Sequence, residues 1–317
     1  MIQVEGLTKY YGQHAAIRDL TFEIARGEVI GFLGLNGAGK TTTLKVLGCV
    51  LLPTSGRVTI DGFDVVENPH EIRKRIGFLP DSPPLYEEMT VRGFLSFVAQ
   101  LRGIPAKDVP ERVRIAEEQT ALVDVDGEIV GSLSHGYRQR VGVAQALVHN
   151  PELLILDEPA SGLDPVQIVE MRALIRSLKG QHTILVSSHI LSEISQTCDR
   201  LLIIQEGEIV AQGSEQDLAA RFGTGGYVEI EVRGAPERAL ALACSVPGVG
   251  GASVLRTHDG VTTLRVDGPS ELRPEIARAL VSGGVDLLRL DRGAEKLESI
   301  FLRLTQQDRQ EREVQAA

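Results

Sequence analysis

The 317-residue sequence has few cysteines and no excess of basic residues. Cys49, Cys198 and Cys244 are far apart and show no CxxC spacing, so the sequence predicts neither a disulfide framework nor a cysteine metal cluster. This usage favours a reducing compartment, and we expect a cytoplasmic protein. The formal net charge is −10. We therefore expect no nucleic-acid partner, because no basic surplus is available to neutralise phosphates.

Long apolar runs are also missing. No uninterrupted run in the sequence approaches the roughly 20 residues that span a bilayer. The start, MIQVEGLTKYYG, lacks the basic region and apolar core of a signal peptide. We therefore expect no signal peptide, and we expect any membrane role to depend on a partner protein.

Short apolar runs alternate with helical patterns over the first two-thirds of the sequence. The runs EVIGFLG (28–34), LLILD (153–157) and HTILVSSH (182–189) end in polar residues and suit strands covered on both faces. The alternation predicts an α/β domain over residues 1–222. Between the first two of these strands, the apolar residues of a segment at about 82–148 recur at helical spacing. This pattern predicts an inserted helical subdomain.

A second, smaller domain is predicted after a glycine-rich linker at residues 223–226. The order strand, helix, two strands, helix, strand over residues 227–305 predicts an α+β domain of the ferredoxin-like βαββαβ type. Its hairpin turn is expected at Asp259 and Gly260. We expect a helix at residues 295–307 and a disordered charged tail at residues 306–317.

The segment GLNGAGKTT follows a predicted strand, opens a predicted helix and fits G-x-x-x-x-G-K-[ST]. Glycines allow backbone N–H groups to surround phosphates, and the helix start adds partial positive charge. A lysine in this place reaches the β- and γ-phosphates, and the next hydroxyl binds Mg²⁺. The alternative is a glycine-rich turn with a chance match. The predicted phosphate-binding residues are Gly34, Leu35, Asn36, Gly37, Ala38, Gly39, Lys40, Thr41 and Thr42.

Three polar residues follow predicted strands. Asp157 is placed to hold Mg²⁺ beside Thr41, and Glu158 can polarise an attacking water. The alternative for this pair is a strand-end turn before Pro159. His189 ends the third apolar strand and could sense the γ-phosphate, although a lone histidine there is more often structural.

The segment LSHGYRQRVGVAQAL (133–147) allows two interpretations. Ser134 and His135 could be a nucleophile with its base, or Ser134 could cap a helix whose free N–H groups bind an anion. Adjacent side chains at a helix start generally diverge, and no third orienting carboxylate is evident nearby. These considerations favour the capped helix.

Five segments resemble ATP-binding-cassette (ABC) ATPases in order and spacing: GLNGAGKTT, LSHGYRQRVGVAQAL, LLILDEP, SGLDP and VSSHIL. The resemblance covers residues 2–222. PPLYEEMTV and KLESIFLRLT are most similar to bacterial export ATPases of the multidrug and gliding-motility type. The resemblance implies a P-loop NTPase that binds ATP and Mg²⁺ and powers transport through a separate membrane-spanning permease. It also implies that the chain lies at the inner face of the membrane and touches it only through that permease.

The resemblance further implies a head-to-tail dimer that encloses two ATP molecules. Tyr11 would stack on adenine, with Tyr10 as a substitute, and Glu158 would be the catalytic base. Ser134 and Gly136 would face the γ-phosphate of ATP on the opposite subunit. Several alternatives stay open: a homodimer or a heterodimer, a soluble ABC ATPase in translation or chromosome maintenance, and a regulator without turnover.

Four more positions either have an alternative role or depart from the family pattern. Asp164, in SGLDP, would align the opposite site across the dimer, or cap a helix before Pro165. Asp81 stands where the family usually has glutamine. It could still bind Mg²⁺ through a water molecule, as part of the nucleotide site, but it cannot donate an N–H to a nucleophilic water. His135 and Tyr137 depart from the family pattern LSGGQ.

Overall fold

The computed structural model describes residues 1–222, 227–234, 236–258 and 260–293. The chain divides into two compact units, Met1–Glu215 and Gln216–Ala317. The expected linker at 223–226, the helix at 295–307 and the tail at 306–317 lie outside the described residues, so the domain limits stay predictions. No helix in the described part of the chain is both long and apolar enough to cross a bilayer.

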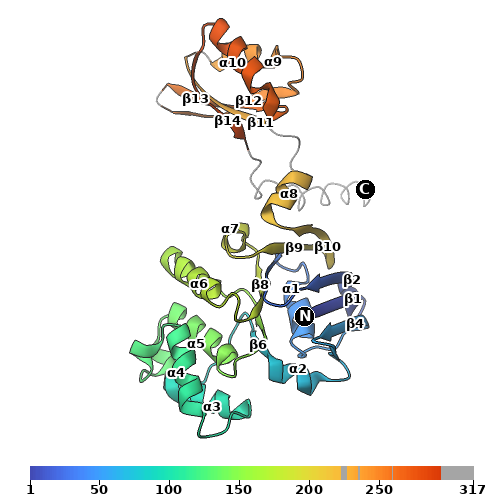
Figure 1. The fold of residues 1–317 in the computed structure, drawn as a ribbon, viewed down its shortest axis with the longest axis vertical. Coiled ribbons are helices and arrows are strands. Elements are labelled where there is room, and N and C mark those ends of the chain that lie inside the picture. Colours follow the sequence, from blue (N-terminus) through green and yellow to red (C-terminus); the bar gives the residue numbers. More distant parts are fainter. Residues whose placement is uncertain (223–226, 235, 259, 294–317) are drawn as a thin grey trace. The chain divides into compact units, whose positions relative to one another are not determined.

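The first unit contains a six-stranded sheet in the order β10-β9-β3-β8-β7-β6 (Figure 1). Strands β9, β3, β8, β7 and β6 are parallel, and β10 returns antiparallel beside β9. Every residue of β3, β7 and β8 is buried, as expected for strands covered on both faces. The α/β prediction is therefore confirmed. The strands are β3 (Val29–Leu33), β6 (Ile76–Leu79), β7 (Leu153–Leu156), β8 (Thr183–Ser188), β9 (Arg200–Gln205) and β10 (Glu208–Gly213).

A second, antiparallel sheet in the order β2-β1-β4-β5 packs against the first. Its alternating residues Ile2, Val4 and Phe22 join the same apolar core as Phe32 of β3 and Leu44 of α1. The rings of Phe22 and Phe32 lie 6.3 Å apart between centroids. These strands are β1 (Ile2–Tyr11), β2 (His14–Ile24), β4 (Ser55–Ile60) and β5 (Phe63–Asp64).

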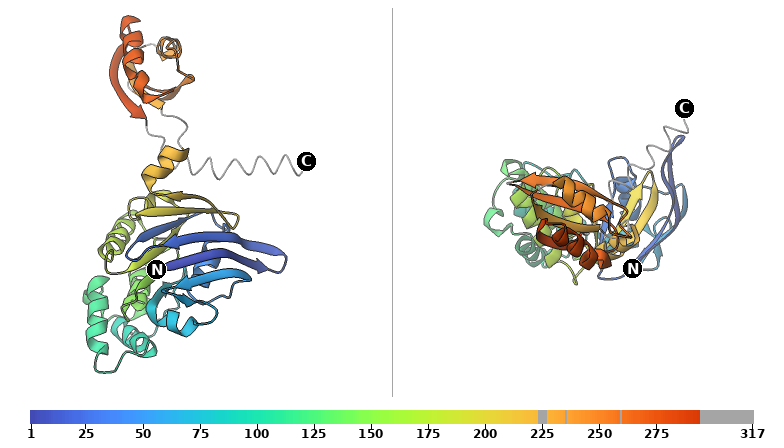
Figure 2. Two further views of the ribbon diagram at one scale, coloured as in Figure 1. Left: turned by 45° about the vertical axis from the view of Figure 1, so that its right-hand side comes forward. Right: turned by 90° about the horizontal axis from the view of Figure 1, so that it is seen from above.

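Helices α3, α4 and α5 form a group of their own beside the sheets (Figures 1 and 2). They share an apolar core that includes Phe94, Val113 and Val141. Thr90 caps α3, because its hydroxyl accepts from the Gly93 N–H at 3.1 Å. The helices of this unit are α1 (Lys40–Leu47), α2 (Pro69–Arg75), α3 (Val91–Leu101), α4 (Val109–Gln119), η1 (Val123–Val125), η2 (Val130–Ser132), α5 (His135–Leu147), α6 (Pro165–Ser177) and α7 (Leu191–Ile194).

The second unit contains an antiparallel sheet in the order β12-β13-β11-β14. Alternate β11 residues Val228, Ile230 and Val232 pack with Ile276 and Leu280 of α10. The predicted βαββαβ order is confirmed, although Asp259 of the hairpin turn lies outside the described residues. The elements are α8 (Glu215–Phe222), β11 (Tyr227–Arg233), α9 (Pro236–Cys244), β12 (Gly251–His258), β13 (Val261–Asp267), η3 (Ser270–Leu272), α10 (Arg273–Ser282) and β14 (Asp286–Gly293).

Candidate active site

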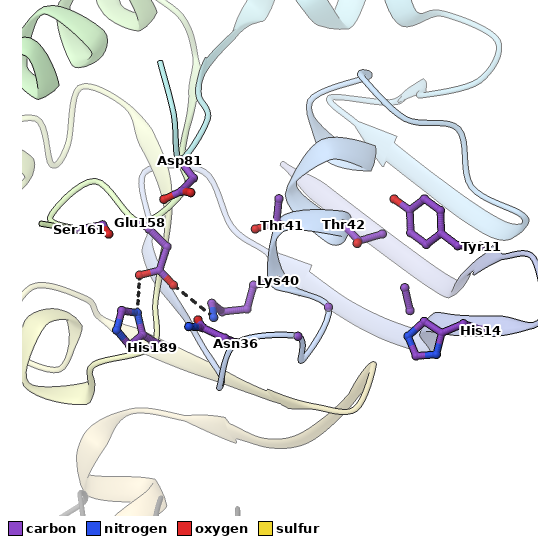
Figure 3. Close-up of a pocket in the computed structure, with 13 residues that line it drawn as sticks. Tyr11, His14, Asn36, Lys40, Thr41, Thr42, Asp81, Glu158, Ser161 and His189 are labelled. Carbon is purple, nitrogen blue, oxygen red and sulfur yellow. Dashed lines mark hydrogen bonds and ion pairs between the residues drawn. The ribbon is translucent and has the colours of Figure 1, made fainter. Parts of the chain in front are cut away.

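The carboxyl ends of β3, β6, β7 and β8 meet at one edge of the parallel sheet, where open α/β folds bind ligands. A pocket of about 510 Å³ lies there (Figure 3). Ten of the residues predicted from the sequence line it, together with three that were not predicted. The lining residues are Tyr11, His14, Ala16, Asn36, Gly37, Gly39, Lys40, Thr41, Thr42, Asp81, Glu158, Ser161 and His189.

The loop between β3 and α1 has the close backbone approaches that require glycine. A Cβ atom at Gly34 would lie 2.5 Å from the carbonyl oxygen of Ile204, and one at Gly39 would lie 2.6 Å from that of Ala16. Gly39 also has φ +104°, which side-chain-bearing residues rarely adopt. Leu35 and Ala38 belong to the same loop but do not line the pocket. The loop therefore has the compact shape that phosphate binding through backbone N–H groups requires.

Lys40 is buried at the start of α1, with 5% of its surface exposed. Its Nζ donates to the carbonyl oxygens of Gly34, at 2.7 Å, and Leu35, at 3.3 Å. It also lies 3.2 Å from Oε1 of Glu158. The cation is thus held between the loop and the carboxylate that follows β7, as Figure 3 shows.

Glu158 joins Lys40 to His189. Its Oε2 lies 2.8 Å from Nδ1 of His189, and an ionised carboxylate only accepts, so Nδ1–H is the donor. The backbone of Glu158 has φ +50°, and its N–H donates to Oγ of Ser187 at 2.9 Å. A non-glycine residue in this conformation stores strain of the kind that collects at functional sites.

Asp157 is almost fully buried and incompletely hydrogen-bonded. Its Oδ1 accepts from the Ser187 hydroxyl at 2.6 Å, whereas Oδ2 has no hydrogen-bond partner of good geometry among the described residues. Burial raises the pKa of this carboxyl; the hydroxyl groups of Ser187 and Thr41 lower it, and Asp81 and Glu158 raise it further. A buried carboxylate next to other carboxylates is unfavourable unless a cation binds beside it.

The β1–β2 hairpin supplies an aromatic edge to the pocket. Tyr11 lines the pocket and is half exposed, whereas Tyr10 does not line it. His14 pairs with Tyr11 across the hairpin and lines the pocket too. Sequence reasoning missed His14, although a two-residue hairpin loop after Tyr11 would have placed it opposite the tyrosine.

Two predicted residues prove to be helix caps outside the pocket lining. Ser134 caps α5, since its Oγ accepts from the Tyr137 N–H at 3.4 Å. Asp164 caps α6 by accepting from the N–H groups of Val166, at 3.0 Å, and Gln167, at 2.9 Å. Gly136, which also lies outside the lining, is buried.

The alternative of a Ser134–His135 catalytic pair is not supported. His135 places Nε2 3.0 Å from the carbonyl oxygen of Ser161, and the Ser134 hydroxyl is engaged with the backbone of its own helix. A nucleophile and its base must share a hydrogen bond, and these two side chains have other partners. The interpretation of Ser134 as a helix cap is confirmed.

Comparison with known proteins agrees with this geometry. The family described as ABC transporter matches residues 17–161. Bacitracin transport ATP-binding protein BcrA of Bacillus licheniformis is 37% identical over 306 residues, 96% of this chain and 97% of that protein. Daunorubicin resistance ATP-binding protein DrrA3 of Streptomyces coeruleorubidus is 34% identical over 98% of both chains. A solved ATP-binding subunit of an ABC transporter has a TM-score of 0.64 at 31% identity, covering 70% of this chain and 93% of its own. The chain therefore belongs to the ABC transporter family, as an ATP-binding ATPase subunit of the export type.

Proposed function

We propose that the pocket at the sheet edge binds ATP with Mg²⁺ and hydrolyses it to drive export through a separate membrane-spanning subunit. The observation that supports this most strongly is the contact of one carboxylate, Glu158, with both the buried Lys40 at 3.2 Å and the partly exposed His189 at 2.8 Å. A phosphate-release assay on the purified chain tests it.

The roles of the three side chains follow from their contacts. Lys40 places its charge at the loop that would hold the β- and γ-phosphates. Glu158 accepts a proton from the attacking water, and His189 orients that carboxylate through Nδ1. Because Nδ1–H is already a donor to Glu158, a hydrogen bond from Nε2 to the γ-phosphate requires the doubly protonated imidazole. Tyr11 offers a half-exposed ring for the adenine base.

The residues around Asp157 fit a magnesium ion. Its buried Oδ2 lacks a hydrogen-bond partner of good geometry, and the Thr41 hydroxyl is the second protein ligand that we propose. No group of three or more His, Cys, Asp or Glu side chains forms a metal cluster in the described ranges, which suits an ion that takes most ligands from phosphates and water. Bound there, Mg²⁺ would neutralise charge on the phosphate oxygens.

We propose that two cassettes, from one gene or two, complete each other's site. Ser134 and Asp164 are exposed and stand outside the pocket of their own subunit. The free N–H groups at the start of α5 attract anions, so a head-to-tail partner could present its γ-phosphate to them. Ser134 and Gly136 would then serve the partner's nucleotide.

A groove of about 520 Å³ between the sheets and the helical group fits a segment of the permease. It is lined by apolar side chains, Val50, Phe78 and Val98, and by the basic Arg73 and Arg102. Val50 is 62% exposed, and exposed apolar surface rimmed by charge is typical of protein–protein sites. We propose that a cytoplasmic helix of the membrane-spanning subunit occupies this groove, which would hold the cassette at the inner face of the membrane.

The substitution Val50→Asp tests whether the permease binds in this groove. The buried charge would disfavour docking, so we expect co-purification with the permease from detergent-solubilised membranes to fall by about tenfold or more. Thermal unfolding should change little, because the side chain is largely exposed. Val281→Asp, an equally exposed valine on α10, is the matched control. Equal permease recovery with both variants would contradict the assignment.

The substitution Asp81→Gln tests whether it matters that an aspartate stands where the family usually has glutamine. Asp81 raises the pKa of Asp157 and lines the pocket, but it cannot donate a hydrogen bond to a nucleophilic water. We expect this variant to change permease-coupled transport more than the affinity for ATP. The measurement compares ATP titration of the isolated chain with transport by the reconstituted complex. Equal transport by both forms would show that the glutamine position has no special role.

A non-transport role is less well supported. The alternative in chromosome maintenance requires a long coiled-coil arm between α1 and β7. Within that fully described segment, α5 is the longest helix, with 13 residues. The relatives named for bacitracin transport and daunorubicin resistance support the export of an antibiotic, which efflux measurements with those two compounds would test.

A further inference from the structure

His135 connects the start of α5, which we propose serves the partner's nucleotide, with a segment that lines the nucleotide pocket of its own subunit. It is the first residue of α5, and its Nε2 lies 3.0 Å from the carbonyl oxygen of Ser161. A carbonyl oxygen only accepts, so Nε2–H is the donor. Ser161 lines the nucleotide pocket of the same subunit, whereas Ser134, next to His135, does not. The hydrogen bond therefore joins the start of α5 to the wall of the pocket.

The turn at Ser161 is connected directly to Glu158. The Ser161 N–H donates to the carbonyl oxygen of Glu158 at 3.0 Å, and His135 adds a side-chain hydrogen bond to the carbonyl oxygen of Ser161 at the other end of this turn. Gly162, the next residue, has φ +72°, and a Cβ atom there would lie 3.1 Å from Nε2 of His135. The imidazole thus lies directly against this turn.

Further contacts hold the starts of α5 and α6 together. A Cβ atom at Gly136 would lie 2.7 to 2.9 Å from the amide atoms of Gln167, so the two helices approach closely at this point. One helical turn later, Arg140 of α5 and Glu170 of α6 form an ion pair of 2.6 Å. These contacts fix the distance between the helices. The hydrogen bond of His135 to Ser161 differs from them because it ends on the turn that contains Glu158.

We propose that His135 is a positioning residue that couples the two ATP sites of the dimer. Engagement of the α5 start by the partner's nucleotide would fix His135, which in turn fixes the turn that positions Glu158 at the subunit's own nucleotide. A hydrogen bond depends steeply on distance and angle, so a small rotation of the imidazole breaks this connection while the two helices stay in contact. The inference rests on the proposed head-to-tail dimer. It gives a role to one of the two residues that depart from the LSGGQ pattern.

Three substitutions separate the hydrogen bond from packing. His135→Ala removes the side chain, His135→Leu keeps its bulk without a donor, and His135→Gln restores an N–H donor. His135 is exposed, so all three proteins should fold. His70→Ala, at another exposed histidine, is the control.

The readouts are kcat, KM and the Hill coefficient for ATP, measured on the full chain. For the Ala and Leu variants we expect kcat to fall by about three- to tenfold, the range that a single hydrogen bond contributes. Their Hill coefficient should fall toward about 1, because the sites are no longer coupled. The Gln variant and the His70→Ala control should retain parental values. Parental kinetics in all three His135 variants would overturn the proposal, as would recovery in the Leu variant alone.

A second measurement separates this inference from the proposed function. Dimer formation of Glu158→Gln with ATP is followed by size-exclusion chromatography and is compared with the kinetics of His135→Ala. If Glu158→Gln alone forms no dimer with ATP, the proposed composite site fails. If that protein dimerises while the His135→Ala enzyme with intact Glu158 shows parental kcat and Hill coefficient, the composite site stands and the coupling through His135 is refuted.

Discussion

Glu158→Gln is expected to lower ATP turnover by about 100-fold or more, because a general base contributes roughly 10²- to 10⁴-fold. The amide keeps the size of the side chain but cannot accept the proton of the attacking water. The carboxylate is 11% exposed and lies 3.2 Å from Nζ of Lys40. The substitution removes the negative charge of Glu158 beside Lys40, so Lys40 can still attract the phosphates. We therefore expect ATP binding to persist and an ATP-bound dimer to accumulate.

Phosphate release and equilibrium binding of ATP, measured on the same preparation, check this prediction. Glu193→Gln is a suitable control, because Glu193 is a carboxylate after β8 that accepts from Ser188 and does not line the pocket. Turnover by Glu158→Gln at the parental rate would exclude Glu158 as the base.

Lys40→Ala is expected to raise the dissociation constant for ATP by about 10- to 100-fold, since a hydrogen bond to a charged group contributes roughly 1.5–3 kcal/mol. The variant also leaves Glu158 without its cationic partner in a buried position, which adds repulsion toward phosphate. Titration with a fluorescent ATP analogue measures the change.

Lys40→Met serves as the companion variant because it removes the charge while keeping most of the volume of this buried side chain. Both variants should lose affinity to a similar extent if charge is the cause. Parental affinity in the Met variant would show that Lys40 packs the loop and does not bind phosphate.

The sequence was most informative where local rules determine structure. The loop from Gly34 to Thr42 was predictable because glycines, a lysine and hydroxyls occur together between a strand and a helix. The convergence of Glu158 and His189 was also predictable, since both follow strands of one parallel sheet. In the second unit, alternation and turn residues predicted all six elements of the βαββαβ order.

Other features depend on tertiary contacts that no local pattern encodes. The contact of His135 with Ser161 joins residues 26 positions apart, and the orientation of a histidine at a helix start is not specified by its neighbours. The missing partner of Asp157 Oδ2 is likewise visible only once the surrounding strands are in place. The sequence already favoured a helix cap over a nucleophile at Ser134, and the structure adds the separate hydrogen-bond partners of Ser134 and His135.

The most direct test is phosphate release from ATP by the full chain in the presence of Mg²⁺, with Glu158→Gln as the blank. We expect steady turnover that stops when Mg²⁺ is chelated and that is lower by about 100-fold or more in the blank. Phosphate release no faster than that of Glu158→Gln, in a protein that binds ATP, would contradict ATP hydrolysis at this site.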